Sequence, residues 1–340
     1  VRLKPDPNAG HYSGPAMDIR TGLPVVGMVG GGQLARMTHQ AAIALGQSLK
    51  VLAAAENDGA ALVAADTVIG SHTDLDALLA FARDCDVLTF DHEHVPSEHI
   101  RELVKAGATV RPGADALLFA QDKRAMRERL SASGVPTPRW APVRTGADIA
   151  EFAGATGWPV VVKAERGGYD GRGVWIIDGP DGAPTGVDLI VEERVPIVRE
   201  LAAVVARSPF GQVAAYPVVE TVQRDGVCVE VLAPAPGLPD DRAVQAQDLA
   251  IRIATELDVV GLLAVELFDT GADLIVNELA MRPHNSAHWT IEGARTSQFE
   301  QHLRAVLDYP MGDTSLTAPV VVMANVLGAA TTARPDGRDM

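Results

Sequence analysis

Short apolar runs alternate with amphipathic segments over the first third of the chain. The apolar runs at Val25–Val29, Leu49–Ala53 and Asp86–Phe90 predict strands, and the segments between them have helical periodicity. Because strands and helices that alternate in this way build parallel sheets, we expect a doubly wound, Rossmann-like α/β unit over residues 24–117. Residues 1–23 are rich in Pro and Gly, which predicts a disordered leader.

The pattern changes beyond residue 117, where turn residues divide the chain into two further units. Residues 118–185 form the smaller unit, with a polar helix predicted over residues 120–132, a strand, a second helix and a hairpin. Residues 186–340 form the last unit, which begins with a strand at Leu189–Val195. Several more strands flanked by helices predict an α+β fold there.

The segment VVVKAERGGYDGRGV, from Val160 to Val174, is the hairpin of the smaller unit. Its ends predict two strands, and four glycines fall within seven residues of its tip. A two-residue turn needs only one or two glycines, so the excess indicates backbone that approaches a ligand closely and moves. The N–H groups of such a loop can surround phosphate oxygens. The alternative is a surface hairpin with a flexible tip.

A second glycine-rich segment follows the first predicted strand. Gly30, Gly32 and Ala35 match a dinucleotide-binding fingerprint, and Glu56 stands near the place of its ribose-binding acid. Glycines also serve any tight strand-to-helix turn, and the start of the following helix suits any anion. A nicotinamide or flavin binder is therefore an alternative function.

Charge and composition narrow the function classes. The net charge of −15 over 340 residues argues against a nucleic-acid surface or a polybasic membrane contact. Of the 29 lysines and arginines only five are lysines, which draws attention to Lys123 and Lys163, because lysine supplies a compact ammonium that arginine does not. Cys85 and Cys228 are far apart and lack metal-ligand spacing, which predicts reduced thiols in a cytoplasmic protein.

Two glutamates follow apolar runs on neighbouring predicted strands. Glu266 in AVELF and Glu278 in IVNEL should be largely buried, and buried carboxylates are costly unless they are paired or bind a cation. Together with Asn277 they predict a cluster of hard oxygens suited to Mg²⁺ that carries nucleotide phosphates. The alternative is a pair of salt bridges to nearby arginines.

Two polar segments complete the candidate chemistry. Arg282–Trp289 contains a guanidinium, two imidazoles and an amide, which suit a small planar oxyanion because arginine can bind two oxygens at once. Asp91–His94 follows a strand and predicts either a solvated turn or a metal site for which no third ligand has a plausible spacing. The combined motifs predict a magnesium-dependent nucleotide enzyme with a movable lid. The chain lacks the motifs of P-loop proteins and protein kinases.

These motifs occur in the order found in the ATP-grasp superfamily, which the chain resembles over most of residues 25–327. Within it, the chain is similar to the ligases that carboxylate 5-aminoimidazole ribonucleotide in purine biosynthesis. The matching segments are GGGQLARM (30–37), FDHEHVP (90–96), QDK (121–123), VVKAERGGYDGRG (161–173), VEERV (191–195), VRELA (198–202), VELF (265–268), NELAMRPHNSAHWT (277–290) and SQFEQHLRAV (297–306).

The resemblance implies an ATP-grasp fold with a Rossmann-like N-terminal domain, a small lid domain and an α+β catalytic domain. It implies that ATP, bicarbonate and the ribonucleotide react through carboxyphosphate to give the carbamate, ADP and phosphate, with Mg²⁺ as cofactor. A lid suits this chemistry because carboxyphosphate is labile in water. The resemblance also implies a homodimer.

The same resemblance implies roles for individual residues. Glu266 and Glu278 hold Mg²⁺ with Asn277 beside them, while Lys123 and Lys163 hold ATP. The catalytic residues that bind bicarbonate and its phosphorylated form are Arg282, His284 and Asn285. The mobile loop that covers the phosphates comprises Gly168, Tyr169, Asp170, Gly171, Arg172, Gly173 and Val174. The adenine and ribose sites comprise Glu192, Glu193, Arg194, Val195 and Glu200, with Gln223 near them. The ribonucleotide contacts are Tyr169, Asp170, Arg172, Glu93 and Gln33.

The resemblance further implies a C-terminal β unit whose basic residues bind the phosphate of the ribonucleotide. Residues 329–340 read AATTARPDGRDM, and no lysine follows Lys163, so we expect that this unit is either truncated or replaced. Two alternatives therefore stand beside the carboxylating ligase. One is a different ATP-grasp ligase, such as a formate-using or biotin-dependent relative, and the other is a form that binds nucleotide but is catalytically impaired.

Overall fold

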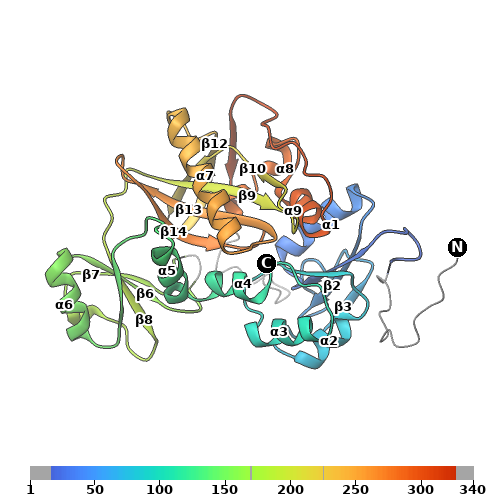
Figure 1. The fold of residues 1–340 in the computed structure, drawn as a ribbon, viewed down its shortest axis with the longest axis horizontal. Coiled ribbons are helices and arrows are strands. Elements are labelled where there is room, and N and C mark those ends of the chain that lie inside the picture. Colours follow the sequence, from blue (N-terminus) through green and yellow to red (C-terminus); the bar gives the residue numbers. More distant parts are fainter. Residues whose placement is uncertain (1–16, 169–170, 225, 327–340) are drawn as a thin grey trace, which may run out of the picture.

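The computed structural model describes residues 17–168, 171–224 and 226–326. Three sheets form three lobes, with the N-terminal sheet on the right of Figure 1, a small sheet at the lower left and a large sheet above them. The N-terminal sheet is parallel, in the order β3-β2-β1-β4, which confirms the doubly wound α/β prediction. Its elements are β1 (Val25–Val29), α1 (Gln33–Ala44), β2 (Ser48–Ala53), β3 (Thr67–Ile69), α2 (Leu75–Ala82), β4 (Val87–Phe90) and α3 (Ser97–Lys105).

Two helices lie where a single helix over residues 120–132 was expected. They are α4 (Ala114–Gln121) and α5 (Lys123–Ala132), and Asp122 separates them with extended backbone angles. The Asp122 carboxylate accepts a hydrogen bond from the N–H of Ala125 at 2.8 Å, so it caps the start of α5. The single-helix prediction was wrong because an Asp that competes for backbone N–H groups favours a cap over a helix interior. As a result, Lys123 is the first residue of α5.

The small sheet has the order β5-β8-β6-β7 and is antiparallel. Val160–Ala164 pairs with Val174–Ile177, which confirms the glycine-tipped hairpin. The strand at Leu189–Glu193 also pairs here, on the other side of β6. Its assignment to the last unit was wrong, because backbone pairing with β5 and β6 places it in the small sheet beyond a turn-rich connection. The elements are β5 (Trp140–Val143), α6 (Gly146–Thr156), β6 (Val160–Ala164), β7 (Val174–Ile177), η1 (Pro180–Gly182) and β8 (Leu189–Glu193).

The large sheet is antiparallel and has the order β14-β13-β9-β11-β12-β15, with β10 paired to β9. The apolar sequences of β9 and β13 place these strands at its buried centre, and α7 packs against them. This arrangement confirms the predicted α+β fold. Its elements are β9 (Arg199–Arg207), β10 (Val213–Ala215), β11 (Val219–Arg224), β12 (Val227–Ala233), α7 (Asp240–Glu256), β13 (Gly261–Asp269), β14 (Leu274–Ala280), η2 (Asn285–Ala287), α8 (Thr290–Gly293), α9 (Gln298–Leu307) and β15 (Val321–Ala324).

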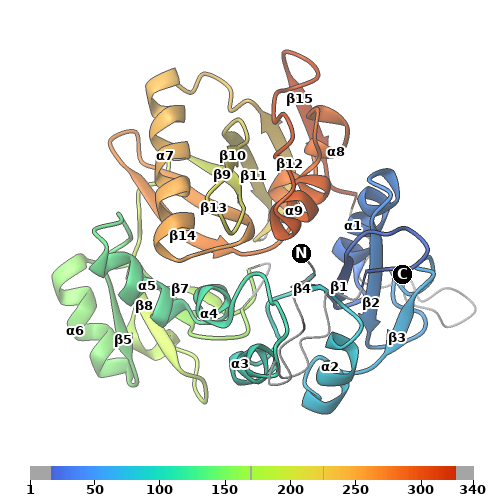
Figure 2. The same cartoon turned by 45° about the vertical axis from the view of Figure 1, so that its right-hand side comes forward.

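Helix α9 joins the N-terminal lobe to the large sheet, as the turned view in Figure 2 shows beside α1. Leu303 and Val306 of α9 share an apolar core with Val26 and Met28 of β1. The buried ring of His302 lies within hydrogen-bond distance of Thr89 on β4 (Nε2 to Oγ1, 2.7 Å). Helix α9 thus packs against both β4 and β13, the strand that carries Glu266.

Two further features concern membrane-spanning helices and the two cysteines. In the described ranges, no helix combines the length and apolar character needed to cross a membrane. Cys228 is buried and Cys85 is half-buried.

Candidate active site

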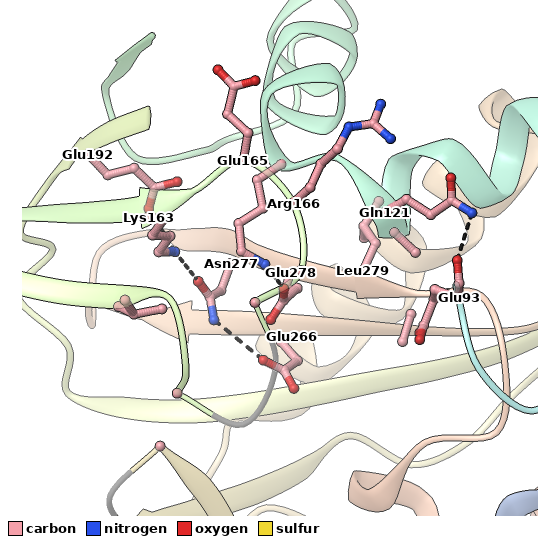
Figure 3. Close-up of a pocket in the computed structure, with 18 of the residues that line it drawn as sticks. Glu93, Gln121, Lys163, Glu165, Arg166, Glu192, Glu266, Asn277, Glu278 and Leu279 are labelled. Carbon is pink, nitrogen blue, oxygen red and sulfur yellow. Dashed lines mark hydrogen bonds and ion pairs between the residues drawn. The ribbon is translucent and has the colours of Figure 1, made fainter. Parts of the chain in front are cut away.

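A cleft of about 1570 Å³ opens where the three lobes meet. Figure 3 shows that acidic, basic and amide side chains point into it from β6, β13, β14 and the segments around them. Most of the predicted site residues line this one cleft. They are Glu93, Lys123, Lys163, Gly168, Gly171, Val174, Glu192, Glu193, Arg194, Val195, Glu200, Gln223, Glu266, Asn277, Glu278, Arg282, His284 and Asn285.

A few predicted residues do not belong to this set. Tyr169 and Asp170 lie outside the described residues. Arg172 and Gly173 belong to the same hairpin but are not among the described residues on the cleft wall. Gln33 is exposed at the start of α1, lies near Gly59 and is not among the residues that line the cleft. The sequence suggested Gln33 because it begins a helix at a glycine-rich turn, and a carboxylate of the protein occupies that turn, as described below.

Glu266 and Glu278 stand directly opposite each other on β13 and β14. Burial, reinforced by the charge of Glu278, raises the pKa of Glu266 to about 7. Burial would raise the pKa of Glu278 as well, but its ion pair with Lys123 outweighs that effect and lowers it. Asn277 lies beside them, with its amide nitrogen 3.4 Å from Glu266 Oε2.

These side chains fit a hard divalent cation by the chemistry of their donors. Two facing carboxylates that repel each other at the wall of a cleft are stabilised by a cation between them, and carboxylate oxygens are what Mg²⁺ prefers. Among the described residues, no cluster of three or more His, Cys, Asp or Glu side chains is arranged to hold a metal. The donor set is therefore a two-carboxylate one, which is typical of magnesium that also takes ligands from phosphate.

Lys163 is held on the cleft wall by a buried ion pair. Its ammonium lies 2.8 Å from Glu192 Oε2 and 3.0 Å from Asn277 Oδ1, and Figure 3 shows this bridge between β6 and β14. The other carboxylate oxygen of Glu192, Oε1, accepts a hydrogen bond from Arg127 Nε at 2.7 Å. Burial raises the pKa of Glu192, but its two cationic neighbours prevail and hold that pKa at about 2. The carboxylate of this predicted adenine-strip residue is thus already engaged by two cations of the protein.

The glycine-tipped hairpin borders the cleft above these lysines. Gly173 has φ +75°, a left-handed conformation that favours glycine, and the carbonyl oxygen of Arg172 approaches Gly168 so closely that a side chain there would collide with it. Lys123 is drawn to the same place, since its backbone N–H donates to the carbonyl of Glu165 at 2.8 Å. Glycines of the hairpin and two ammonium groups therefore border the same cleft.

The segment after β14 meets the N-terminal lobe in the cleft. Arg282 Nε forms an ion pair with Glu93 at 2.6 Å, and Gln121 fixes the loop that carries Glu93 by donating to the carbonyl of Glu93 at 2.6 Å. Burial lowers the pKa of His284 to about 3, so its ring is neutral. The N–H of Ser286 donates to Nδ1 of that ring, which assigns the ring proton to Nε2, 3.5 Å from Glu266. A guanidinium and a neutral imidazole donor thus lie beside the paired glutamates.

Asn285 completes this oxyanion-binding segment. Its side-chain oxygen is buried and has no hydrogen-bond partner among the described residues. A buried polar atom without a partner is costly unless a ligand or water satisfies it. This observation favours a site that is completed by something it binds.

The turn at Gly30–Gly32 is closed by the protein's own side chain. Asp91 follows β4, and its carboxylate accepts a hydrogen bond from the N–H of Gly32 at 2.7 Å. Gly30 has φ +111°, and a Cβ at that position would overlap the Asp91 carboxylate. The start of α1 therefore already has its anion, which argues against the nicotinamide or flavin alternative.

The rest of the Asp91–His94 segment is a packed turn. The rings of His72 and His92 meet edge to face at 4.6 Å, and those of His92 and His94 stack at 5.3 Å. Burial lowers the pKa of His92 to about 3. The predicted metal site at this segment finds no support among the described residues, because they form no group of three ligands there.

Sequence reasoning missed three residues of the site. Arg127 lies behind the cleft wall, while Glu165 and Arg166 line it. Arg127 had a signal, since it falls between Met126 and Leu130 on the apolar face of its helix, where an arginine needs a partner. Glu165 and Arg166 had only their position next to the glycines.

Comparisons with known proteins agree with this geometry. A family model described as the ATP-grasp domain matches residues 128–299, and one described as the ribonucleotide synthetase preATP-grasp domain matches residues 23–121. The N5-carboxyaminoimidazole ribonucleotide synthase of Mycobacterium tuberculosis is 63% identical over 317 residues, which cover 90% of this chain and 74% of that protein.

Solved structures give the same result. The N5-carboxyaminoimidazole ribonucleotide synthetase of Thermus thermophilus is 38% identical with a TM-score of 0.83, covering 89% of this chain and 84% of that one. A synthase from Aspergillus clavatus, in complex with ADP and 5-aminoimidazole ribonucleotide, is 32% identical with a TM-score of 0.85 and covers 91% of this chain and 83% of that one.

Proposed function

Since the chain belongs to the ATP-grasp family and, within it, to the N5-carboxyaminoimidazole ribonucleotide synthases, we infer that it is an ATP-dependent carbon–nitrogen ligase of purine biosynthesis. Its reaction is the ATP-dependent carboxylation of 5-aminoimidazole ribonucleotide. The observation that supports this most directly is the meeting in one cleft of Lys123, Lys163, the facing pair Glu266 and Glu278, and Arg282.

The carboxyl donor in our proposal is bicarbonate. An oxygen of bicarbonate attacks the γ-phosphorus of ATP, which releases ADP and forms carboxyphosphate. Carboxyphosphate then breaks its C–O bond to phosphate and yields CO₂, which the exocyclic amine of the ribonucleotide captures as a carbamate with loss of a proton. Arg282 and the Nε2 proton of His284 are placed to bind the anionic oxygens of bicarbonate and of the carboxyphosphate.

The lysines and the hairpin act on the triphosphate. Lys163 and Lys123 present ammonium groups at the wall beneath Gly168, where they neutralise charge that develops on the transferred phosphoryl group. Closure of the hairpin excludes water, and carboxyphosphate survives only where water is excluded. The roles of the individual residues, including Glu192–Val195 at adenine and Glu200 at ribose, are part of the proposal.

Magnesium is also part of the proposal. Glu266 and Glu278 would hold it, with Asn277 beside them, and when bound it would neutralise part of the negative charge of the phosphates. Lys123 pairs with Glu278 in this structure. When a cation binds the Glu278 carboxylate instead, the ammonium of Lys123 becomes available to a phosphate.

Two further proposals rest on the family resemblance. The protein is a cytoplasmic homodimer that takes small molecules as partners, with neither nucleic acid nor membrane among them. Light scattering of the purified chain at micromolar concentration tests the dimer, and a monomeric mass would refute it.

A coupled assay for ADP, with each substrate omitted in turn, tests the proposed function. Release of ADP should require ATP, bicarbonate and 5-aminoimidazole ribonucleotide together, and formate or biotin should not replace bicarbonate. Activity with formate or biotin would indicate a different ATP-grasp ligase. Binding of Mg-ATP without any release would indicate the impaired form.

A further inference from the structure

Arg127 on α5 has the largest fully buried side chain in the described part of the chain. It does not line the cleft. Taking an arginine out of water is costly, so its charge and donors must be satisfied by well-placed partners. Its contacts show which parts of the molecule it joins.

The guanidinium of Arg127 touches three acceptors on two sheets. Its Nε lies 2.7 Å from Glu192 Oε1 on β8, in the small sheet. Its Nη1 donates to the carbonyl of Val276 at 3.3 Å and its Nη2 to that of Asn277 at 2.8 Å, both on β14 of the large sheet. A single planar group therefore fixes the lateral position of β8 against β14.

Two of the three residues that accept hydrogen bonds from Arg127, Glu192 and Asn277, also contact Lys163. Glu192 gives one oxygen to Arg127 and the other to Lys163, at 2.8 Å. Asn277 gives its backbone carbonyl to Arg127 and its side-chain oxygen to Lys163, at 3.0 Å. The place of the Lys163 ammonium on the cleft wall is thus set by two groups that Arg127 itself holds.

Lys163 is the cation of this group that reaches the ligand cleft. One carboxylate, Glu192, stands between two buried cations, and of the two only Lys163 reaches the cleft. Its ammonium is therefore the cationic group of this set that is placed to contact a phosphate bound in the cleft.

We propose that Arg127 is a positioning residue for the nucleotide: it orients Glu192 and Asn277 so that Lys163 is presented to the phosphates when ATP binds. This inference rests on the proposed function for the identity of the ligand. Arginine suits the task because its fork donates in fixed directions to three acceptors, which a lysine cannot do.

The test measures nucleotide binding and turnover in variants of the full chain. Arg127→Met should weaken binding of Mg-ADP in calorimetry, and raise the KM for ATP, by about 10- to 100-fold, the usual effect of losing a hydrogen bond to a charged group. Arg127→Lys should recover part of the loss, because it keeps a charge beside Glu192. The KM for the ribonucleotide should stay unchanged. Arg129→Met is the matched control, since Arg129 lies on the same helix with its guanidinium at the surface.

A double variant separates positioning from a general effect on folding. In a Lys163→Met background, Arg127→Met should weaken Mg-ADP binding by a much smaller factor than in the wild type, since the group through which it acts is gone. An undiminished effect in that background, or a lower kcat with an unchanged KM for ATP in Arg127→Met or Arg127→Lys, overturns the proposal. If Arg127→Met does not fold, Arg127→Lys in both backgrounds decides by the same criterion. If the wild-type protein binds Mg-ADP but forms no ADP when all three substrates are present, the proposed function is refuted. The binding test of Arg127 still applies in that case.

Discussion

The chain has two glycine-rich segments, and their surroundings differ. At Gly30–Gly32 the turn is filled by Asp91, whose carboxylate takes the Gly32 N–H and leaves no room for a side chain at Gly30. At Gly167–Gly173 the hairpin borders an open cleft with Lys123 and Lys163 on its wall. Both segments match a nucleotide-binding pattern, yet the first already binds a carboxylate of the protein, while the second lies on the wall of a cleft.

The difference shows what a glycine pattern does and does not specify. Glycine permits backbone N–H groups to converge, but the occupant depends on what the rest of the fold brings to that point. A carboxylate from the adjacent strand β4 makes the first segment a structural joint. A wall of cations facing paired carboxylates makes the second a site for a phosphorylated ligand and a metal.

The largest expected effect is on turnover, from a substitution of one of the paired glutamates in the cleft that the second segment borders. Glu278→Gln removes a proposed magnesium ligand that faces Glu266, so we expect ADP release to fall by about 100- to 1000-fold, the scale of the charge stabilisation that a catalytic metal supplies. The coupled ADP assay measures it, with Glu230→Gln, at an exposed carboxylate of β12, as the control. Unchanged turnover would refute the metal assignment.

A change at the first segment should act on stability instead. Gly30→Ala places a methyl group against Asp91 at φ +111°, so we expect a loss of roughly 3 kcal/mol in the free energy of unfolding, from strain and overlap. Urea denaturation measures it. Gly22→Ala also has a positive φ but open space around it, and should cost less. Equal losses in the two variants would show that the Asp91 overlap adds nothing.

Loss of Lys163 should affect ATP more than folding. Lys163→Ala removes an ammonium group from the cleft wall, so the KM for ATP should rise about 10-fold or more. Folding should be less affected, because Arg127 still pairs with Glu192. Steady-state kinetics with saturating bicarbonate and ribonucleotide give the value. An unaltered nucleotide affinity would count against its place under the phosphates.

The smallest effect concerns pH at the first segment. Burial raises the pKa of Asp91 to about 6, above its value of 3.8 in the unfolded chain. The folded state therefore binds the extra proton between these values, and this group's contribution to stability falls as pH rises from about 4 to 6. Asp91→Asn should lessen the decline between pH 4 and 7 by about 2 kcal/mol in urea denaturation. Parallel stability curves for the two proteins would contradict it.

Local pattern was enough to predict much of this molecule. Apolar runs located the strands, and the spacing of Glu266 and Glu278 after two such runs located the facing carboxylates before any pairing was known. Each of these features depends on residues close together in the chain.

The features that the sequence did not reveal depend on long-range pairing. Leu189–Glu193 has the same apolar pattern whichever sheet it joins, so only its partners assign it to the small one. Asp91 binds Gly32 at a sequence separation of 59, and Arg127 binds Glu192 at a separation of 65. No local pattern predicts these partners. The cap at Asp122 was accessible in principle, because Asp before a polar helix is a common start signal.

Hydrogen exchange with and without Mg-ADP tests most directly which glycine-rich segment binds the nucleotide. Amides of residues 163–168 and 171–174 should exchange more slowly when Mg-ADP is present, while those of residues 30–36 should exchange at the same rate. Protection of residues 30–36, or none at the hairpin under saturating Mg-ADP, would contradict the account.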